Sequence, residues 1–163
     1  MNIILKNKNL YFNEHKIKCS IGKKGITSKK IEGDQKTPRG TFRFNSIFYR
    51  KDRISKINST LKKYIIKKDM GWCDDIESAS YNKRIRFPFN FSAEKLWLKK
   101  NIYDVIIVIN YNQKPIVKNK GSAIFLHIAS KKYKYTKGCL AITKKDILFL
   151  VKIINSKTKI IIN

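Results

Sequence analysis

The feature that most constrains this chain is a run of five consecutive β-branched residues, Val105–Ile109, with a polar residue at each end. The run has the length of a strand, because a membrane-spanning helix needs about 18 apolar residues. Branching at Cβ favours the extended backbone. We therefore expect residues 104–110 to form a buried strand. No apolar run in the chain approaches membrane-spanning length, so no transmembrane segment is expected.

Several other segments also show strand patterns. Apolar and polar residues alternate over 16–21 and 42–45, and short apolar segments occur at 10–12, 123–128 and 159–162. An alternation with period two predicts strands with one buried face. We therefore expect the first 21 residues to form short strands, with Cys19 pointing into the core and chemically inert.

One helix is clearly indicated, in the C-terminal half of the chain. Thr143-Lys-Lys-Asp146 resembles a capping box, and apolar residues follow it at helical spacing (Ile147, Leu148, Leu150, Val151 and Ile154). A second, shorter helix is expected over Ser92–Leu98, with Ser92 as its cap. The pattern predicts a mainly β fold of the β-rich α+β class, with residues 1–163 forming a single domain.

Three further segments are expected to be irregular. Thr37-Pro-Arg-Gly40 suits a type I turn, since Pro presets φ and Gly fits the last position. Residues 50–70 are basic and without period, which indicates an excursion over the surface. Gly71-Trp-Cys-Asp-Asp75 reads as a compact loop that either lines a substrate groove or packs on itself.

The net charge of +26 is large for 163 residues and has two interpretations. A basic surface can attract nucleic acid, anionic lipid or an acidic polymer. The alternative is a coding bias, because only six of the 37 cationic residues are Arg and Lys, Ile and Asn are all abundant. Nucleic-acid readers rely on Arg for bidentate contacts, and no RNA-reading motif appears. We therefore expect no nucleic-acid partner, and we expect a monomer.

The cysteines and histidines argue against a metal site. Cys19, Cys73 and Cys139 show no CxxC spacing, and the chain has only two histidines. We expect no metal and no cofactor. Two carboxylates follow Cys73, which disfavours its thiolate, so Cys73 is expected to be structural.

Cys139 is the candidate nucleophile, with His127 as its base. His127 ends an apolar strand, and Cys139 follows Gly138 just ahead of the predicted helix. A loop of eleven residues between them could bring the imidazole to the thiol. A neighbouring base or cation lowers a thiol pKa, and Lys137 adds positive charge. Gly138 permits a sharp turn, and the N–H groups of Gly138 and Cys139 could bind an oxyanion.

On spacing alone, two unrelated core residues explain His127 and Cys139 better than a catalytic pair does, because one His and one Cys in 163 residues are weak evidence. No Asp or Asn lies in residues 128–142 to orient the imidazole, and Asp146 is better explained as a capping residue. A backbone carbonyl would have to orient the ring instead.

Two motifs resemble the signature of the L,D-transpeptidase (YkuD-type) catalytic domain. One is Gly121-Ser-Ala-Ile-Phe-Leu-His127, followed after a loop by Thr136-Lys-Gly-Cys-Leu140. The other lies upstream, where Gly33-Asp-Gln-Lys-Thr-Pro-Arg-Gly-Thr-Phe42 is similar to the family's Gly-Asp-x-x-Thr-Pro-x-Gly-x-Phe segment. Residues 71–75 with Tyr81-Asn82 resemble a loop in one bacterial branch of this family. The resemblance spans roughly residues 22–151.

The resemblance implies a small sandwich-like β fold and a peptidoglycan-modifying enzyme. Cys139 would attack a carbonyl of a diaminopimelate-type residue in a stem peptide, forming a thioester that an amine acceptor resolves into a cross-link. His127 would move the protons, with a backbone carbonyl as the third member. We expect Gly138 to belong to the catalytic group, and Thr136, Lys137, Trp72 and Arg39 to contact the substrate.

Two departures from the family pattern leave the acceptor open. Lys137 stands where many members have His, and Ala141 stands where many have Asn or Arg. A subgroup that includes hydrolases looks more similar, so an L,D-carboxypeptidase or endopeptidase transferring the acyl group to water is the alternative. An inactive wall-binding or nucleic-acid-binding module is a more distant one.

Localisation follows from the resemblance alone. The implied substrate lies outside the cytoplasmic membrane, which favours the cell envelope or periplasm. The first residues, Met1-Asn-Ile-Ile-Leu-Lys-Asn, show no signal-peptide pattern, so the cytoplasm is the alternative.

Overall fold

The computed structural model describes all 163 residues, and it is mainly β, as predicted. One α-helix and one 3-10 turn accompany the strands. In chain order, the elements are β1 (Asn2–Lys6), β2 (Asn9–Phe12), β3 (His15–Lys18), β4 (Ile26–Thr27), β5 (Thr37–Pro38), β6 (Gly40–Tyr49), β7 (Lys62–Ile65), β8 (Met70–Cys73), β9 (Arg84–Arg86), β10 (Ala93–Lys95), η1 (Asn101–Tyr103), β11 (Val105–Ile109), β12 (Phe125–Ile128), β13 (Leu140–Ile142), α1 (Lys144–Ile153) and β14 (Lys159–Ile162).

A nine-stranded mixed sheet forms the body of the protein. Its order is β13-β12-β11-β6-β14-β1-β2-β3, and β7 pairs with β6 beside this path. The strands curl into a barrel-like sandwich, so the predicted sandwich fold is confirmed. The N- and C-terminal strands β1 and β14 pair in parallel, which joins the two ends of the chain in one sheet.

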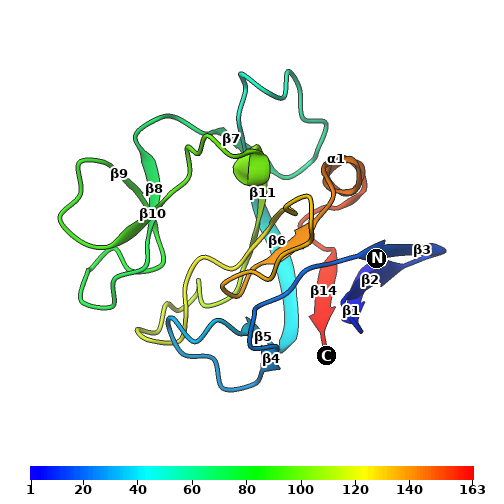
Figure 1. Ribbon diagram of the computed structural model, residues 1–163, viewed down its shortest axis with the longest axis horizontal. Coiled ribbons are helices and arrows are strands. Elements are labelled where there is room, and N and C mark those ends of the chain that lie inside the picture. Colours follow the sequence, from blue (N-terminus) through cyan, green and yellow to red (C-terminus); the bar gives the residue numbers. More distant parts are fainter.

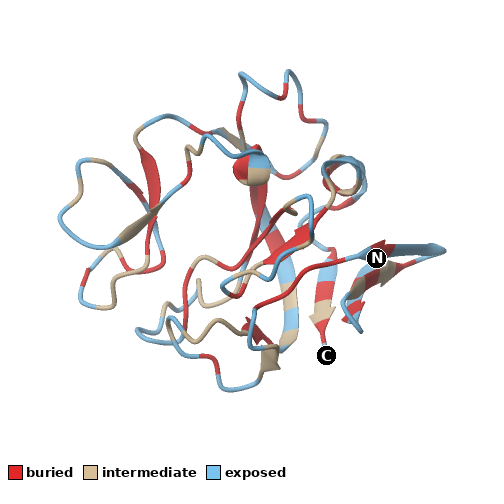
Figure 2. Cartoon of the chain, viewed as in Figure 1, coloured by how far each residue is buried: buried red, intermediate tan, exposed pale blue.

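The five-residue run of β-branched side chains forms β11, and every residue in it is buried. Its side chains alternate between two hydrophobic cores. Val105, Ile107 and Ile109 belong to the larger core, whereas Ile106 and Val108 belong to the smaller one. Both faces of β11 are therefore covered, which explains why the run has no polar position. Figure 2 shows the resulting concentration of buried residues along the central strands.

The two cores lie on opposite faces of the central strands. Helix α1 covers one face and buries Ile147, Leu150 and Val151 there. The three-stranded sheet β10-β8-β9 stands on the other side of β6 and β11 (Figure 1). Trp72 of β8 packs its ring edge-to-face against Phe125 of β12, with the ring centroids 5.2 Å apart. This contact joins the small sheet to the strand that carries His127.

The predicted strands and the long helix are confirmed. Residues 2–18 form three short strands, Cys19 is 2% exposed, and α1 is capped by Thr143, whose side chain accepts a hydrogen bond from the Asp146 N–H. The helix predicted over residues 92–98 is wrong. Ala93–Lys95 forms β10 instead, because it pairs with β8, and these strand hydrogen bonds outweigh the weak local helix signal.

Three irregular segments are also more regular than predicted. Residues 37–40 are extended rather than turned, because β5 pairs with β4 and Gly40 begins β6. Residues 50–70 are not a mere surface excursion, since β7 pairs with β6 and Ile54, Ile57 and Leu61 enter the larger core. The loop predicted at 71–75 begins as strand β8 at the centre of the small sheet.

No helix of the protein is both long and apolar enough to cross a membrane.

Asn82 is the polar residue that ties the small sheet to the main one. Its Oδ1 accepts hydrogen bonds from Trp72 Nε1 (3.0 Å) and from the Ala123 N–H (3.1 Å), and its Nδ2 donates to the Asn112 carbonyl (2.6 Å). The residue is 3% exposed and has φ of 54°, a conformation that Asn tolerates better than most side chains.

We predict that Asn82→Ala lowers the free energy of unfolding by about 2–4 kcal/mol, because the buried Trp72 indole N–H and the partly buried Ala123 N–H lose their acceptor. Urea unfolding measures this loss. The exposed Asn45→Ala, which breaks only a surface hydrogen bond to Gln113, should change the value by less than about 0.5 kcal/mol. Equal effects of the two substitutions would refute the linking role of Asn82.

Candidate active site

A cavity of about 660 Å³ opens where β12, the loop after it and the small sheet meet. Cys139, His127, Gly138, Thr136 and Lys137 all line it. The structure therefore brings five of the seven predicted site residues to one cavity. Its volume is within the range of small-molecule and peptide-binding clefts.

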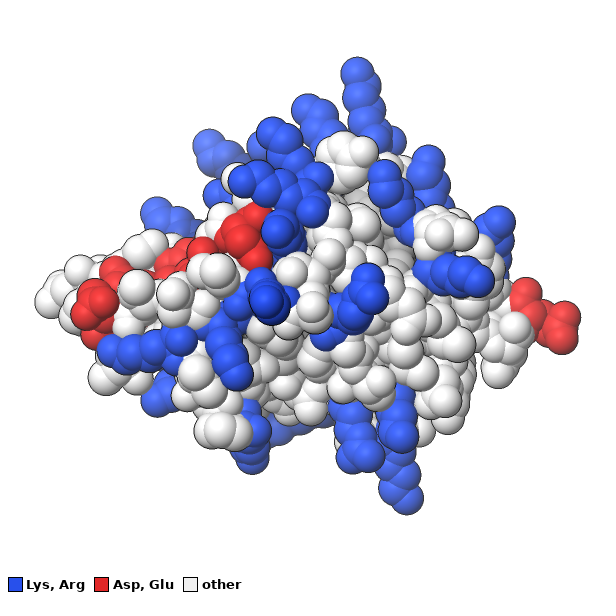
Figure 3. All heavy atoms as spheres, turned by 90° about the horizontal axis from the view of Figure 1, so that it is seen from below, with Lys and Arg blue, Asp and Glu red and all other residues white.

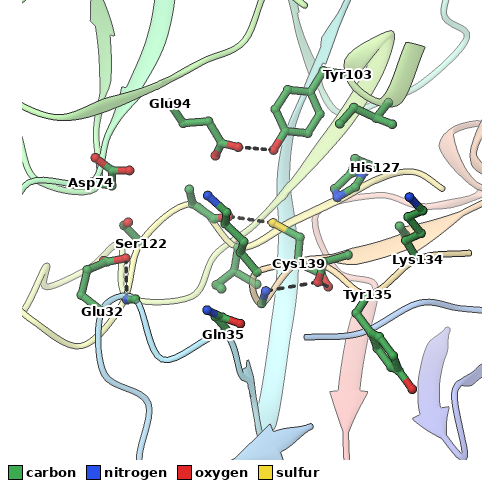
Figure 4. Close-up of a pocket in the computed structure, with 18 of the residues that line it drawn as sticks. Glu32, Gln35, Asp74, Glu94, Tyr103, Ser122, His127, Lys134, Tyr135 and Cys139 are labelled. Carbon is green, nitrogen blue, oxygen red and sulfur yellow. Dashed lines mark hydrogen bonds between the residues drawn. The ribbon is translucent and has the colours of Figure 1, made fainter. Parts of the chain in front are cut away.

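Strand pairing explains how the chain brings His127 to Cys139. β12 and β13 are parallel neighbours, with His127 opposite Ala141. Because side chains two residues apart point to the same face of a strand, Cys139 shares a face with Ala141 and therefore with His127. The two side chains are diagonal neighbours across adjacent strands. Figure 4 shows the imidazole and the sulfur facing the same cavity.

Backbone contacts with the N-terminal third of the chain hold the loop that leads to Cys139. The Thr136 N–H donates to the Ile21 carbonyl (3.0 Å), and the Lys23 N–H donates to the Thr136 carbonyl (2.9 Å). The fully buried Thr37 hydroxyl accepts from the Gly22 N–H and donates to the Gly138 carbonyl, each at 2.9 Å. The upstream motif and the cysteine motif therefore meet through Thr37.

Gly138 is required by both conformation and space. Its φ of 137° lies in a region that residues with a side chain rarely adopt. A Cβ at this position would lie 2.8 Å from the Lys36 carbonyl oxygen, which is backbone and cannot move aside cheaply. The Gly138 N–H donates to the Thr136 hydroxyl (3.1 Å), and the same hydroxyl donates to the Cys139 carbonyl (2.6 Å). Thr136 thus shapes the turn around the thiol.

The Cys139 thiol lies between two backbone groups. It donates to the Ala123 carbonyl (3.0 Å) and accepts from the Phe125 N–H at 3.4 Å. Ala123 in turn donates its N–H to Asn82. The thiol is therefore positioned by a chain of hydrogen bonds that begins in the small sheet.

His127 is 7% exposed, and its Nδ1 lies 3.0 Å from the Ile128 carbonyl oxygen. A carbonyl only accepts, so this contact places the ring proton on Nδ1 and leaves Nε2 free to take a proton. The Tyr103 ring packs edge-on against the imidazole, with centroids 5.2 Å apart. A backbone carbonyl orients this histidine, in the place that an acidic side chain takes in many catalytic groups.

Burial keeps both groups neutral at pH 7. It raises the pKa of Cys139 to about 12, and the negative charge of Glu94 adds to the rise, whereas the Phe125 N–H and Lys30 oppose it. Burial also lowers the pKa of His127 to about 4, and the Ile128 carbonyl opposes that shift. The expectation of a lowered thiol pKa is therefore wrong. Lys137 is exposed, and desolvation of the thiol outweighs the attraction of nearby cations.

Three acidic side chains on the cavity wall are not among the predicted site residues. One of them, Asp74, lies in the 71–75 segment, for which lining of a substrate groove was one of two interpretations. Glu32, Asp74 and Glu94 all line the cavity, and Figure 4 shows Asp74 and Glu94 across it from Cys139. Glu94 lies in the segment that the sequence predicts as a helix, and that prediction does not place its side chain beside the cavity. In the structure it belongs to the edge strand β10 of the small sheet. Glu32 directly precedes the upstream motif, which was its only signal.

The structure does not bring Trp72 or Arg39 to the cavity. Trp72 is 6% exposed and uses its indole N–H on Asn82, while Arg39 is exposed elsewhere, after β5. Of the 71–75 segment, Asp74 lines the cavity whereas Trp72 and Cys73 are packed in the interior, and Tyr81 and Asn82 are buried as well. Both readings of this loop therefore apply, each to different residues.

One comparison with known proteins places the chain in a family. The family model described as the L,D-transpeptidase catalytic domain (YkuD) matches residues 3–162, which is nearly the whole chain. No curated protein gives a significant match.

The thiol is predicted to react slowly with iodoacetamide at neutral pH, because a pKa near 12 leaves only about one thiolate in 10⁵ at pH 7. The alkylation rate should rise about tenfold per pH unit from 7 to 10, with no plateau near neutrality. Intact mass spectrometry measures it. Cys19 and Cys73 are buried, so Cys139→Ala should remove the native-state labelling. A rate plateau below pH 8 would instead indicate a preformed thiolate–imidazolium pair.

His127 should also make the fold sensitive to acid. Its pKa is about 4 when folded and near 6.5 when unfolded, so the unfolded chain binds the extra proton between these values. The stabilisation is complete above pH 6.5 and is lost as the pH falls to about 4, at a cost of about 3 kcal/mol. Urea unfolding at pH 7.5 and pH 4 should show a smaller loss for His127→Asn than for the parent. The exposed His15→Asn is the control and should match the parent.

Proposed function

The chain belongs to the family of L,D-transpeptidase catalytic domains, and from this premise we propose that Cys139 carries the acyl group as a thioester. Membership of the family makes the protein an enzyme of peptidoglycan modification. The observation that supports the proposal is that His127 on β12 and Cys139, directly before the parallel strand β13, face the same cavity, with Nδ1 of His127 held by the Ile128 carbonyl.

In the first half-reaction, Nε2 of His127 takes the thiol proton as Sγ of Cys139 attacks a carbonyl carbon of the stem peptide. The tetrahedral intermediate then collapses. The amide C–N bond breaks, the imidazolium gives its proton to the departing amine, and a thioester remains. Because both groups are neutral at rest, the proton moves during attack rather than before it.

In the second half-reaction, an amine from another stem attacks the thioester. His127 accepts its proton, the C–S bond breaks, and Cys139 recovers its proton. A new amide bond forms, which is a cross-link. Water in place of the amine would give a free carboxylate by the same steps.

We assign the oxyanion to the Cys139 N–H. The Gly138 N–H is donated to the Thr136 hydroxyl, so it is occupied in the resting site. Gly138 then acts through backbone shape and Thr136 through the turn it holds, since a donor must be fixed in place to stabilise a developing charge.

The proposal gives Thr136 and Lys137 substrate contacts, because both line the cavity. Trp72 acts through packing and Asn82 rather than by touching the substrate. Peptidoglycan as substrate implies action in the cell envelope, which the family membership supports.

Acylation by a carbapenem tests the nucleophile and its base. The strained ring carbonyl should acylate Cys139 and add one adduct to the intact mass. Cys139→Ala should form no adduct, and His127→Ala should form it at least about 10²-fold more slowly. Cys73→Ala is the matched control and should react like the parent, because its thiol is buried away from the cavity.

The acceptor is tested with a stem tetrapeptide. Transfer gives a cross-linked dimer, and hydrolysis gives a tripeptide with a free carboxylate. We expect the dimer.

In the carbapenem experiment, an adduct that persists in Cys139→Ala, or no adduct on folded protein, would overturn the assignment of the nucleophile.

A further inference from the structure

The acidic residues of this chain are few and unevenly placed. Eleven Asp and Glu stand against 37 Lys and Arg, yet Glu32, Asp74 and Glu94 all line the cavity that holds Cys139. Figure 3 shows acidic side chains gathered toward one side of the face it draws, while basic side chains are spread over it. In a molecule of charge +26, a cavity wall with three carboxylates is a departure that composition does not explain.

Asp74 is the least satisfied member of the wall. Its Oδ1 is the one buried side-chain oxygen or nitrogen in the protein that has no hydrogen-bond partner. A buried carboxylate oxygen without a hydrogen-bond partner costs free energy, because the oxygen loses its bonds to water and gains none in the protein. Asp74 directly follows β8, and Figure 4 shows its carboxylate pointing into the cavity.

The other two carboxylates are each held by a tyrosine. The Tyr103 hydroxyl donates to Oε1 of Glu94, and the Tyr81 hydroxyl donates to Oε2 of Glu32 at 2.6 Å. These bonds fix the direction of the carboxylates without neutralising them. Burial raises the pKa of Glu94, and the charges of Asp74 and Glu32 raise it further, whereas the Tyr103 hydrogen bond and the charge of Lys137 oppose the rise. Glu94 is therefore repelled by each of the other two carboxylates.

No salt bridge of the protein neutralises this wall, although the exposed Lys137 attracts Glu94 over a longer distance. The five salt bridges use other acidic residues, and Lys30, which also lines the cavity, is paired with Asp34 at 2.6 Å. The three carboxylates do not belong to any group of ligands compact enough to hold a metal ion. A cationic organic group is the partner that remains, and an ammonium, with three donors, can bond to several separated oxygens.

We propose that Asp74, Glu94 and Glu32 form a subsite for a primary ammonium group carried by the substrate. Asp74 supplies the unpaired oxygen, and the tyrosine-held Glu94 and Glu32 supply the surrounding negative charge. The subsite and Cys139 line the same cavity, so an ammonium bound there belongs to a molecule that also reaches the thiol or its thioester.

This inference rests on the proposed function, which offers two sources for the ammonium. It is either a side-chain amine of the acyl donor or the amine of the acceptor, which binds as an ammonium and gives up one proton to solvent before its lone pair attacks the thioester. The first source would affect acylation of Cys139, and the second would affect only its release.

Binding of a simple amine tests the subsite without any acyl chemistry. The parent protein is titrated with pentylammonium, and in parallel with 1-pentanol, while amide chemical shifts are followed by NMR. Pentylammonium should shift the amides of residues 73–75 and 93–95, and pentanol should not. Asp74→Asn should weaken pentylammonium binding at least about fivefold, and the exposed Glu77→Gln should leave it unchanged.

Equal responses to the two probes, or unchanged binding by Asp74→Asn, would overturn the subsite. The NMR spectrum itself reports whether Asp74→Asn is folded, and Glu94→Gln provides a second variant with the same expected loss.

The source of the ammonium is read from two rates on a stem tetrapeptide, followed by intact mass. Asp74→Asn should slow acylation of Cys139 at least about fivefold if the donor carries the ammonium, and N-acetylation of the donor should slow the parent to the same extent. If the acceptor carries the ammonium, Asp74→Asn should instead slow only the amine-dependent release of the acyl group from Cys139. Unchanged rates in both steps would overturn the proposal.

A peptide that never acylates Cys139 would refute the proposed function, while the pentylammonium titration still decides the subsite.

Discussion

The position of the Cys139 sulfur depends on one short chain of hydrogen bonds, from Asn82 through the backbone of Ala123 to the thiol. Ala123 has φ of 51°, which costs a residue with a side chain roughly 1–2 kcal/mol. The hydrogen bonds on either side of it hold the strained peptide in place. The β8–β9 connection that supplies Asn82 is therefore part of the site's construction, although Asn82 itself does not line the cavity.

The second constraint is the absence of charge on Cys139 and His127, the proposed nucleophile and its proposed base. A partly buried thiol beside a buried imidazole stays protonated, because the protein offers little to solvate a thiolate. Such a site is protected from indiscriminate alkylation and oxidation. In the mechanism that we propose, the thiol becomes nucleophilic only when a carbonyl is positioned so that proton transfer and attack proceed together. The fixed tautomer of His127 matters for this reason, since a ring free to turn would offer the wrong nitrogen.

Local pattern was enough to predict the elements that are regular over several residues. The β-branched run of β11 and the capped stripe of α1 were predicted because burial and period appear in consecutive residues. Ala93–Lys95 and Met70–Cys73 were mispredicted because their strand character comes from pairing with each other, which no local window contains. The pair of Cys139 and His127 was predictable from a motif, whereas the pKa directions were not, because they depend on burial by the distant residues that enclose the site.

The cavity has both cationic and anionic side chains in its lining, although the net charge of the molecule is strongly positive. Lys134 and Lys137 line it as exposed cations, while Glu32, Asp74 and Glu94 form a wall of opposite charge. A general attraction to anionic polymers would need only the basic surface and would gain nothing from a half-buried acidic wall. Keeping three carboxylates together in a desolvated site costs stability, and that cost is offset only when a cation arrives. The arrangement therefore favours a ligand that carries both charges within the reach of one cavity, which is a property of peptides with free amines and carboxylates rather than of nucleic acid.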